Sequence, residues 1–122
     1  MKKLIISNIS YIGYFSLFLD LDDGGRGKYE VFYPELGKKE EEFTLDDKQT
    51  KRAIRLLEQT DFSSIEKDDT QLFLDTPTNK IFYLDGAISR VVEYHSGDIP
   101  KELKPLIKII KMIYPDIIDR LD

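Results

Sequence analysis

The chain is 122 residues long, with apolar residues making up 41% and charged residues 34% of it. These values exclude a disordered segment and predict one folded domain over residues 1–122. The absence of cysteine excludes disulfides, thiolate nucleophiles and cysteine-ligated metal centres, and a formal charge of −5 at pH 7 disfavours nonspecific binding to a nucleic-acid backbone.

The N-terminus superficially resembles a secretion signal, because Lys2 and Lys3 precede an apolar run over residues 4–19. Polar and small residues interrupt the run, and no small-residue cleavage site follows it. The run is also shorter than the roughly 20 residues that span a bilayer. We therefore expect neither a signal nor a membrane partner, and a cytoplasmic location.

A β-hairpin is predicted over residues 14–33. Residues 14–21 alternate, with Phe15 and Leu17 on one side and Tyr14 and Phe18 on the other, which is typical of a strand. The turn at 22–27 is rich in aspartate and glycine, and residues 28–33 resume an extended pattern. Pro34 ends this second strand. Residues 37–42 are interpreted as an exposed connection, with a short strand at 41–43 as the alternative.

A helix is predicted from Thr44 to about Thr60. Thr44 stands three residues before Asp47, so its hydroxyl is a candidate N-cap, and acidic residues suit the positive end of the helix dipole. Apolar residues gather on one side of the helix. The opposite side carries a basic stripe, formed by Lys48, Lys51, Arg52 and Arg55.

Three strands are predicted next, over residues 70–75, 80–84 and 87–95. A turn containing Pro77 joins the first pair, and Asp85-Gly86 is a strong hairpin signal between the second pair. We expect a three-stranded antiparallel meander.

A second helix is predicted after Pro100, which suits its first turn, with apolar residues at three- and four-residue spacing. Pro105 should delay the true start or kink the first turn, and Pro115 should break the helix. The element order is thus β-β-α-β-β-β-α. We predict an α+β fold in which two helices pack on one face of an antiparallel sheet of about five strands.

This layout resembles a family of small bacterial domains of unknown function. The matching features are an N-terminal aromatic strand, an Asp-Gly turn, a helix ending near a Phe, an Asp-x-Pro turn and a Pro-started C-terminal helix. They correspond here to Gly13-Tyr14-Phe15-Ser16-Leu17, Asp23-Gly24, Phe62, Asp75-Thr76-Pro77, and Pro100 with Leu103. The resemblance implies the fold and no catalytic activity. The cysteine-rich start of some members is missing.

No motif for cofactor or metal chemistry is complete. The segment from Asp20 to Gly25 begins like a calcium loop, but Gly24 occupies the fifth position and Val31 the twelfth, where a bidentate glutamate should stand. The glycines at 24–27 join two strands rather than opening a helix, so they do not form a phosphate loop. We expect no cofactor and no metal.

Weak acid and base candidates remain. His95 is the only histidine, and it lies at a predicted strand end near Ser96 and Asp98. Asp75 and Asp85 lie at the two connections of the predicted meander and could meet at one sheet edge. Loop and turn chemistry explains these positions at least as well, and nothing in the spacing of the carboxylates is diagnostic of catalysis.

Two surfaces are candidates for binding. The basic stripe of Lys48, Lys51, Arg52 and Arg55 suits an acidic protein or a phosphate, although a solvated helix face is the simpler interpretation. Aromatic side chains fall on both faces of the predicted sheet, since Tyr14 and Phe18 lie opposite Phe15, and Phe82 lies opposite Tyr83. Two helices cover one face only, so the other should present an aromatic patch to solvent.

The sequence therefore favours a non-enzymatic protein-interaction domain, immunity-like or inhibitor-like in kind, whose partner is another protein or a second copy of the chain. One alternative is a small enzyme or ligand-binding domain that uses the carboxylates at a sheet edge. Another is a structural domain that only dimerises.

Overall fold

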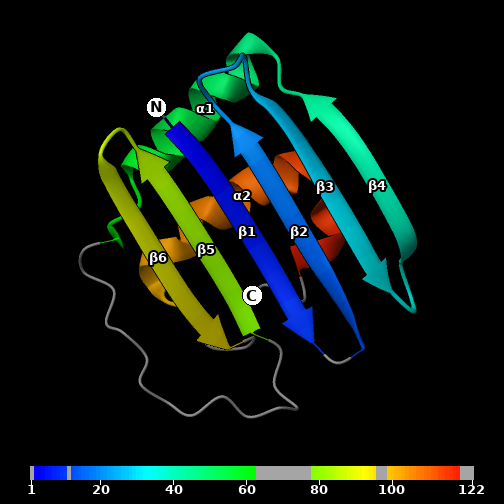
Figure 1. Ribbon diagram of the computed structural model, residues 1–122. Coiled ribbons are helices and arrows are strands. Elements are labelled where there is room, and N and C mark those ends of the chain that lie inside the picture. The colour runs from blue at the N-terminus through cyan, green and yellow to red at the C-terminus, as the bar shows by residue number, and fades with distance from the viewer. Residues whose placement is uncertain (1, 11, 63–77, 96–98, 119–122) are drawn as a thin grey trace.

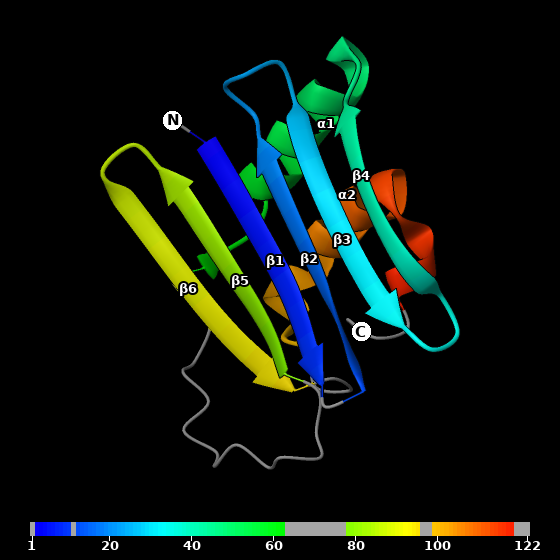
Figure 2. The ribbon, with the colours of Figure 1, turned by 45° about the vertical axis from the view of Figure 1, so that its right-hand side comes forward.

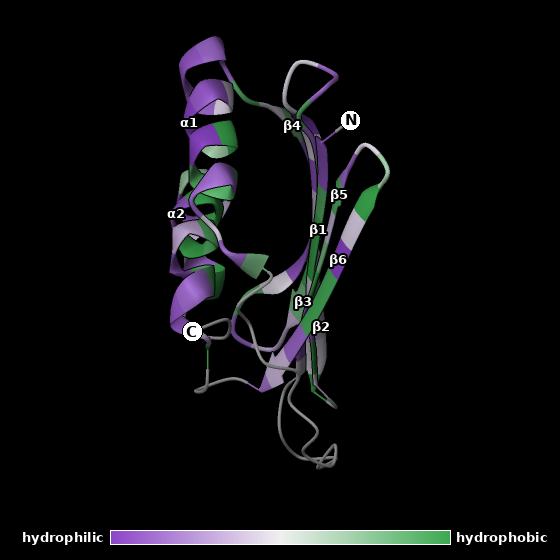
Figure 3. Cartoon of the chain, turned by 90° about the vertical axis from the view of Figure 1, so that its left-hand side faces the viewer, coloured by the Kyte–Doolittle hydropathy of each residue, from purple (hydrophilic) through white to green (hydrophobic). Residues whose placement is uncertain are grey.

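The computed structural model describes residues 2–10, 12–62, 78–95 and 99–118 of the chain. Its centre is one antiparallel sheet of six strands in the order β4-β3-β2-β1-β5-β6 (Figure 1). Both helices lie on the same side of this sheet, as the side view in Figure 3 shows. The chain is therefore an α+β fold with a helical layer on one face of the sheet.

The strands are β1 (Lys2–Ser10), β2 (Gly13–Asp20), β3 (Arg26–Tyr33), β4 (Gly37–Thr44), β5 (Thr78–Asp85) and β6 (Ile88–His95). The helices are α1 (Asp47–Glu58) and α2 (Lys104–Ile113), with short 3-10 helices η2 (Lys101–Leu103) and η3 (Pro115–Ile117) on either side of α2.

Strand β1 is a correction to the predicted count of about five strands. It lies in the middle of the sheet between β2 and β5. Leu4 and Ile6 are fully buried on the helix-facing side, whereas Ile5 and Ile9 point to the other side. Because a strand with apolar residues on both faces reads as a continuous apolar run, the alternation is hidden in the sequence.

Strand β4 corrects the prediction of an exposed connection at residues 37–42. All of Gly37–Thr44 pairs with β3, and nearly every residue is exposed because β4 is an edge strand. Its charges find cross-strand partners: Lys28 Nζ lies 2.5 Å from Glu40 Oε1, and the Tyr29 hydroxyl donates to Glu41 Oε2 at 2.9 Å. Charged side chains on an edge also discourage pairing with another chain.

The hairpin of β5 and β6 is confirmed, with a turn at Gly86 that has a φ of 62°. The predicted strand at residues 70–75 lies outside the described residues. In the sheet, the two neighbours of β5 are β1 and β6. This arrangement joins the first part of the chain to the last through the β1 and β5 pair (Figure 2).

The helix boundaries follow from caps and prolines. Asp46, not Thr44, is the N-cap of α1. Its carboxylate accepts a hydrogen bond from the Gln49 backbone N–H at 2.7 Å, and Gln49 Oε1 accepts one from the Asp46 backbone N–H at 3.1 Å. Pro105 lies in the first turn of α2, which begins only at Lys104, and Pro115 follows its end. Both effects of proline are as predicted.

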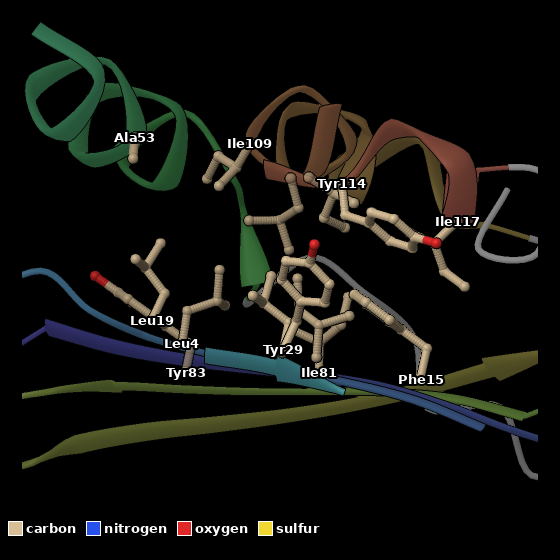
Figure 4. Close-up of a cluster of buried hydrophobic side chains, with 14 of the residues drawn as sticks. Leu4, Phe15, Leu19, Tyr29, Ala53, Ile81, Tyr83, Ile109, Tyr114 and Ile117 are labelled. Atoms are coloured by element: carbon tan, nitrogen blue, oxygen red, sulfur yellow. The ribbon is translucent and has the colours of Figure 1, made fainter. Parts of the chain in front are cut away.

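The core lies between the sheet and the helices (Figure 4). Leu4, Phe15 and Ile81 from the sheet face Ile109 and other apolar residues of the helical layer. Tyr114, just after α2, stacks on Tyr29 and Phe15 with ring centroids 4.9 and 6.1 Å away. These stacked rings join the C-terminal layer to β2 and β3.

Candidate protein-interaction surface

The sheet face opposite the helices, here called the open face, is covered by no described element. Figure 1 views the molecule from this side, with the helices behind the sheet. Strand alternation places every second side chain on it. Its large apolar side chains include three that are about half exposed or more: Ile9 at 62%, Val91 at 52% and Phe32 at 47%. The others are Ile5, Tyr14, Phe18 and the half-buried Phe82 and Leu84.

The strand register aligns these side chains in two rows. The first apolar row crosses four adjacent strands, because Phe18 pairs with Ile5, Ile5 with Phe82, and Phe82 with Val91. Directly opposed side chains on neighbouring strands lie within contact distance, at Cβ separations of about 5 Å. The first apolar row is thus a continuous band across the sheet from β2 to β6.

The second apolar row contains Phe32, Tyr14 and Ile9 on β3, β2 and β1. The rings of Tyr14 and Phe32 are stacked, with centroids 6.3 Å apart. Between the two apolar rows, the register places a polar row that includes Ser16, Ser7 and Lys80. The open face therefore alternates apolar and polar bands.

Charges on the open face are balanced, although the whole chain carries a formal charge of −5. Lys80 Nζ lies 3.7 Å from Glu93 Oε1, and Lys3 Nζ lies 3.8 Å from Asp20 Oδ2. The strands place equal numbers of basic and acidic side chains on this face. The basic ones are Lys3, Arg26, Lys28, Lys38 and Lys80, and the acidic ones are Asp20, Glu30, Glu40, Glu42 and Glu93. The excess negative charge lies elsewhere on the molecule.

The structure brings together the aromatic candidates from the sequence. Tyr14, Phe18 and Phe82 all lie on the open face, within the two apolar rows. The basic stripe is separate from them. The buried residues Ala53, Leu56 and Leu57 lie on the side of α1 that faces the sheet, so the stripe points away from the sheet. Among the described residues, no ion pair involves its members, Lys48, Lys51, Arg52 and Arg55.

The acid and base candidates do not converge. His95 pairs with Thr78 and Asp85 pairs with Ile88, so the two lie at opposite ends of the β5 and β6 ladder, roughly 23 Å apart at strand rise. Asp85 instead accepts from the Tyr83 hydroxyl at 3.4 Å. Burial, followed by the Asp85 charge, raises the pKa of Tyr83 to about 12. Asp75 lies outside the described residues.

An open depression of about 550 Å³ adjoins the open face where β2, β3 and β4 meet. Phe18 forms one wall, and Arg26, Lys28 and Glu42 are among the charged residues that line it. Its lining mixes both signs of charge, so it selects neither an anion nor a cation by charge alone.

Several open-face residues were missed in the sequence, namely Ile5, Ile9, Phe32 and Val91. The alternation of Phe32 with Val31 and Tyr33 would have placed it opposite the core, had the buried side been known. Ile5 and Ile9 required recognition of β1 as a strand. The rows themselves depend on register between strands distant in the chain, which no local pattern contains.

Comparisons with known proteins add no family: no protein-family model matches the chain, and no curated protein matches it. Within the described ranges, neither helix has both the length and the apolar character needed to cross a bilayer.

Proposed function

We propose that this domain binds another protein through the open face. The observation that carries the proposal is the first apolar row, in which Phe18, Ile5, Phe82 and Val91 lie side by side across four strands without cover from any described residue. Contiguous apolar surface of this kind is costly in water and marks binding sites in folded proteins. Covering it recovers roughly 25 cal/mol for each Å² of apolar area.

A protein fits this surface better than a small molecule or a nucleic acid does. The open face is a broad sheet surface that carries two apolar bands, a polar row between them and charged residues of β4 along one edge. Protein interfaces combine apolar and polar area in comparable proportions. Small ligands prefer concave, enclosed sites. Nucleic acid requires an excess of basic residues, and here the signs are balanced.

An immunity-like or inhibitor-like role falls within this proposal, as does membership of the family of small bacterial domains that the sequence resembles. In an immunity-like or inhibitor-like role, the domain would act by occupying a partner's surface. The residues we assign to binding are Tyr14, Phe18 and Phe82 from the sequence, joined by Ile5, Phe32 and Val91 from the structure.

Photo-crosslinking from single positions tests the proposal. A benzophenone amino acid in place of Phe32, which is 47% exposed on the open face, should form covalent adducts with protein in native lysate. The same amino acid in place of Arg52, on the exposed side of α1, is the matched control and should form few adducts. Mass spectrometry identifies the crosslinked chain.

Equal adduct yields from the two positions, or none from position 32, would contradict binding at the open face. Circular dichroism of both variants checks that the fold is intact.

A further inference from the structure

We propose that the protein bound at the open face is a second copy of this chain, packed face to face about a two-fold axis that runs parallel to the strands between β1 and β2. This inference rests on the proposed function and names its partner. Its support comes from the area, the charge balance and the symmetry of the face.

The area of the open face suits a stable dimer. Six strands spaced about 4.8 Å apart are roughly 29 Å wide, and strands of eight residues are about 26 Å long, which gives about 750 Å² per copy. A standard protein interface buries about 800 Å² per partner. One open face therefore supplies nearly the whole area that a specific dimer requires.

The charge distribution favours self-association on this face and disfavours it elsewhere. Two copies of a chain with a formal charge of −5 repel each other, and the repulsion is weakest where acidic and basic residues are balanced. The open face meets this condition, as Lys28 with Glu40 and Lys80 with Glu93 already form ion pairs within it.

The central part of each row is self-complementary under the proposed axis. In the order β4-β3-β2-β1-β5-β6, a two-fold axis between the two central strands places β1 of one copy over β2 of the other, and each row meets its own copy. Phe18 then packs on Ile5 of the second copy, and Tyr14 packs on Ile9 of the second copy. The polar residues Ser16 and Ser7 meet between them. Aromatic side chains thus face aliphatic ones on the two central strands, whereas farther out Phe82 lies over Lys28 and Val91 over Glu42 of the second copy.

The same axis places β5 over β3 of the second copy. Lys80 and Glu30 lie in the same polar row, so the lysine of each copy faces the glutamate of the other. Stacked sheets are rotated by about 30° relative to each other. This rotation displaces Lys80 and Glu30 from each other less than it displaces residues on the edge strands, because β5 and β3 lie nearer the axis. The dimer contains the contact twice, and at the outer ends of the same row Glu93 lies over Glu40 of the second copy.

Sedimentation equilibrium measures the self-association directly. From about 1 µM to about 1 mM, the wild type should approach twice the 14.2 kDa mass of one chain. Phe18→Lys should weaken the dimer by at least tenfold, roughly the effect of losing a central interface residue. The matched control is Ile88→Lys, since Ile88 is 55% exposed on β6 but belongs to the helix-facing side of the sheet.

Each other result has a definite meaning. A wild type that stays monomeric at the highest concentration overturns the second copy as partner. The proposed function survives that result if position 32 still crosslinks to a different protein. A dimer that Ile88→Lys dissociates and Phe18→Lys does not would be an edge dimer through β6, which also overturns this inference.

A mixing experiment tests the axis. Lys80→Glu alone places Glu against Glu30 of the second copy, and Glu30→Lys alone places Lys against Lys80, so both variants should dimerise more weakly than the wild type. A mixture of the two variants restores opposite charges at both contacts, and native mass spectrometry should show an excess of the mixed dimer. A statistical mixture would contradict the proposed axis.

Discussion

Asn8 is a buried amide on the apolar, helix-facing side of the sheet. It is only 1% exposed, and its Nδ2 donates to Asn79 Oδ1 at 2.6 Å on the neighbouring strand β5. The hydroxyl of Tyr33 donates to the Asn8 side chain from β3. Asn8 therefore links residues from two other strands, and a buried polar group of this kind is stable only while its partners are present.

Replacing Asn8 with Leu should destabilise the fold by about 2–4 kcal/mol, because it removes one hydrogen-bond partner from Asn79 and one from Tyr33 inside the core. The free energy of unfolding in urea is the measurement. Ser7→Ala on the open face is the neighbouring control and should change stability by less than about 0.5 kcal/mol.

A double-mutant cycle separates the loss of the hydrogen bond from the poor packing of the introduced leucine side chain. If the two amides stabilise each other, Asn8→Leu with Asn79→Leu should cost less than the two single changes added together, by at least about 1 kcal/mol. Additive losses would show that the amides act independently.

At the level of elements, the sequence predicts what local patterns determine. The alternation in β2, the Asp85-Gly86 turn between β5 and β6, and the prolines at 105 and 115 were each sufficient to place an element. The central strand β1 was not recognised, and of the charged edge strand β4 only residues 41–43 were considered as a strand, as an alternative to a connection. Their side chains carry no alternation, since β1 is apolar on both faces and β4 is exposed on both.

The candidate surface was predicted in the same partial way. Alternation placed Tyr14 and Phe18 on the side of β2 opposite Phe15, which the structure reproduces. It could not show that Phe82, more than sixty residues later, belongs to the same row as Phe18. That proximity arises because β1 lies between β2 and β5, which is a property of topology and not of local sequence.

The start of α1 gives a prediction at this scale. Asp46→Ala removes the side chain that accepts from the Gln49 backbone, and it should lower the free energy of unfolding by about 1 kcal/mol. Chemical denaturation measures the loss. Thr44→Ala is the informative comparison: Thr44 was the predicted cap, so a larger loss there than at Asp46 would contradict the observed cap.

At the scale of the whole molecule, the stacked rings of Tyr29 and Tyr114 connect the sheet to the segment after α2. The Tyr29 hydroxyl donates to Glu41 on β4, so one side chain contacts the helical layer and the edge strand at once. Burial, followed by the hydrogen bond to Glu41, raises the pKa of Tyr29 to about 12. Ionisation of this phenol would place a negative charge beside a carboxylate.

The stability of the protein should therefore fall in alkaline solution. The folded state holds the Tyr29 proton more tightly than the unfolded state, whose tyrosines ionise near pH 10. The resulting stabilisation is complete below about pH 10 and is lost as the pH rises through about 12. Free energies of unfolding measured across this range should decline less steeply for Tyr29→Phe than for the wild type.

Tyr83→Phe should flatten the same decline, because the pKa of Tyr83 is also raised to about 12. The double variant should flatten it further. Unchanged slopes in both single variants would show that these phenols do not govern alkaline unfolding.

The position of β1 has a consequence for the order of assembly during synthesis. Its residues leave the ribosome before those of the other five described strands, and β2 can pair with one edge at once through a short connection. The other edge has no native partner until residues 78–85 have been made. Until then the nascent chain carries an apolar strand with one unpaired edge, and closure of the sheet depends on contact between segments far apart in the chain.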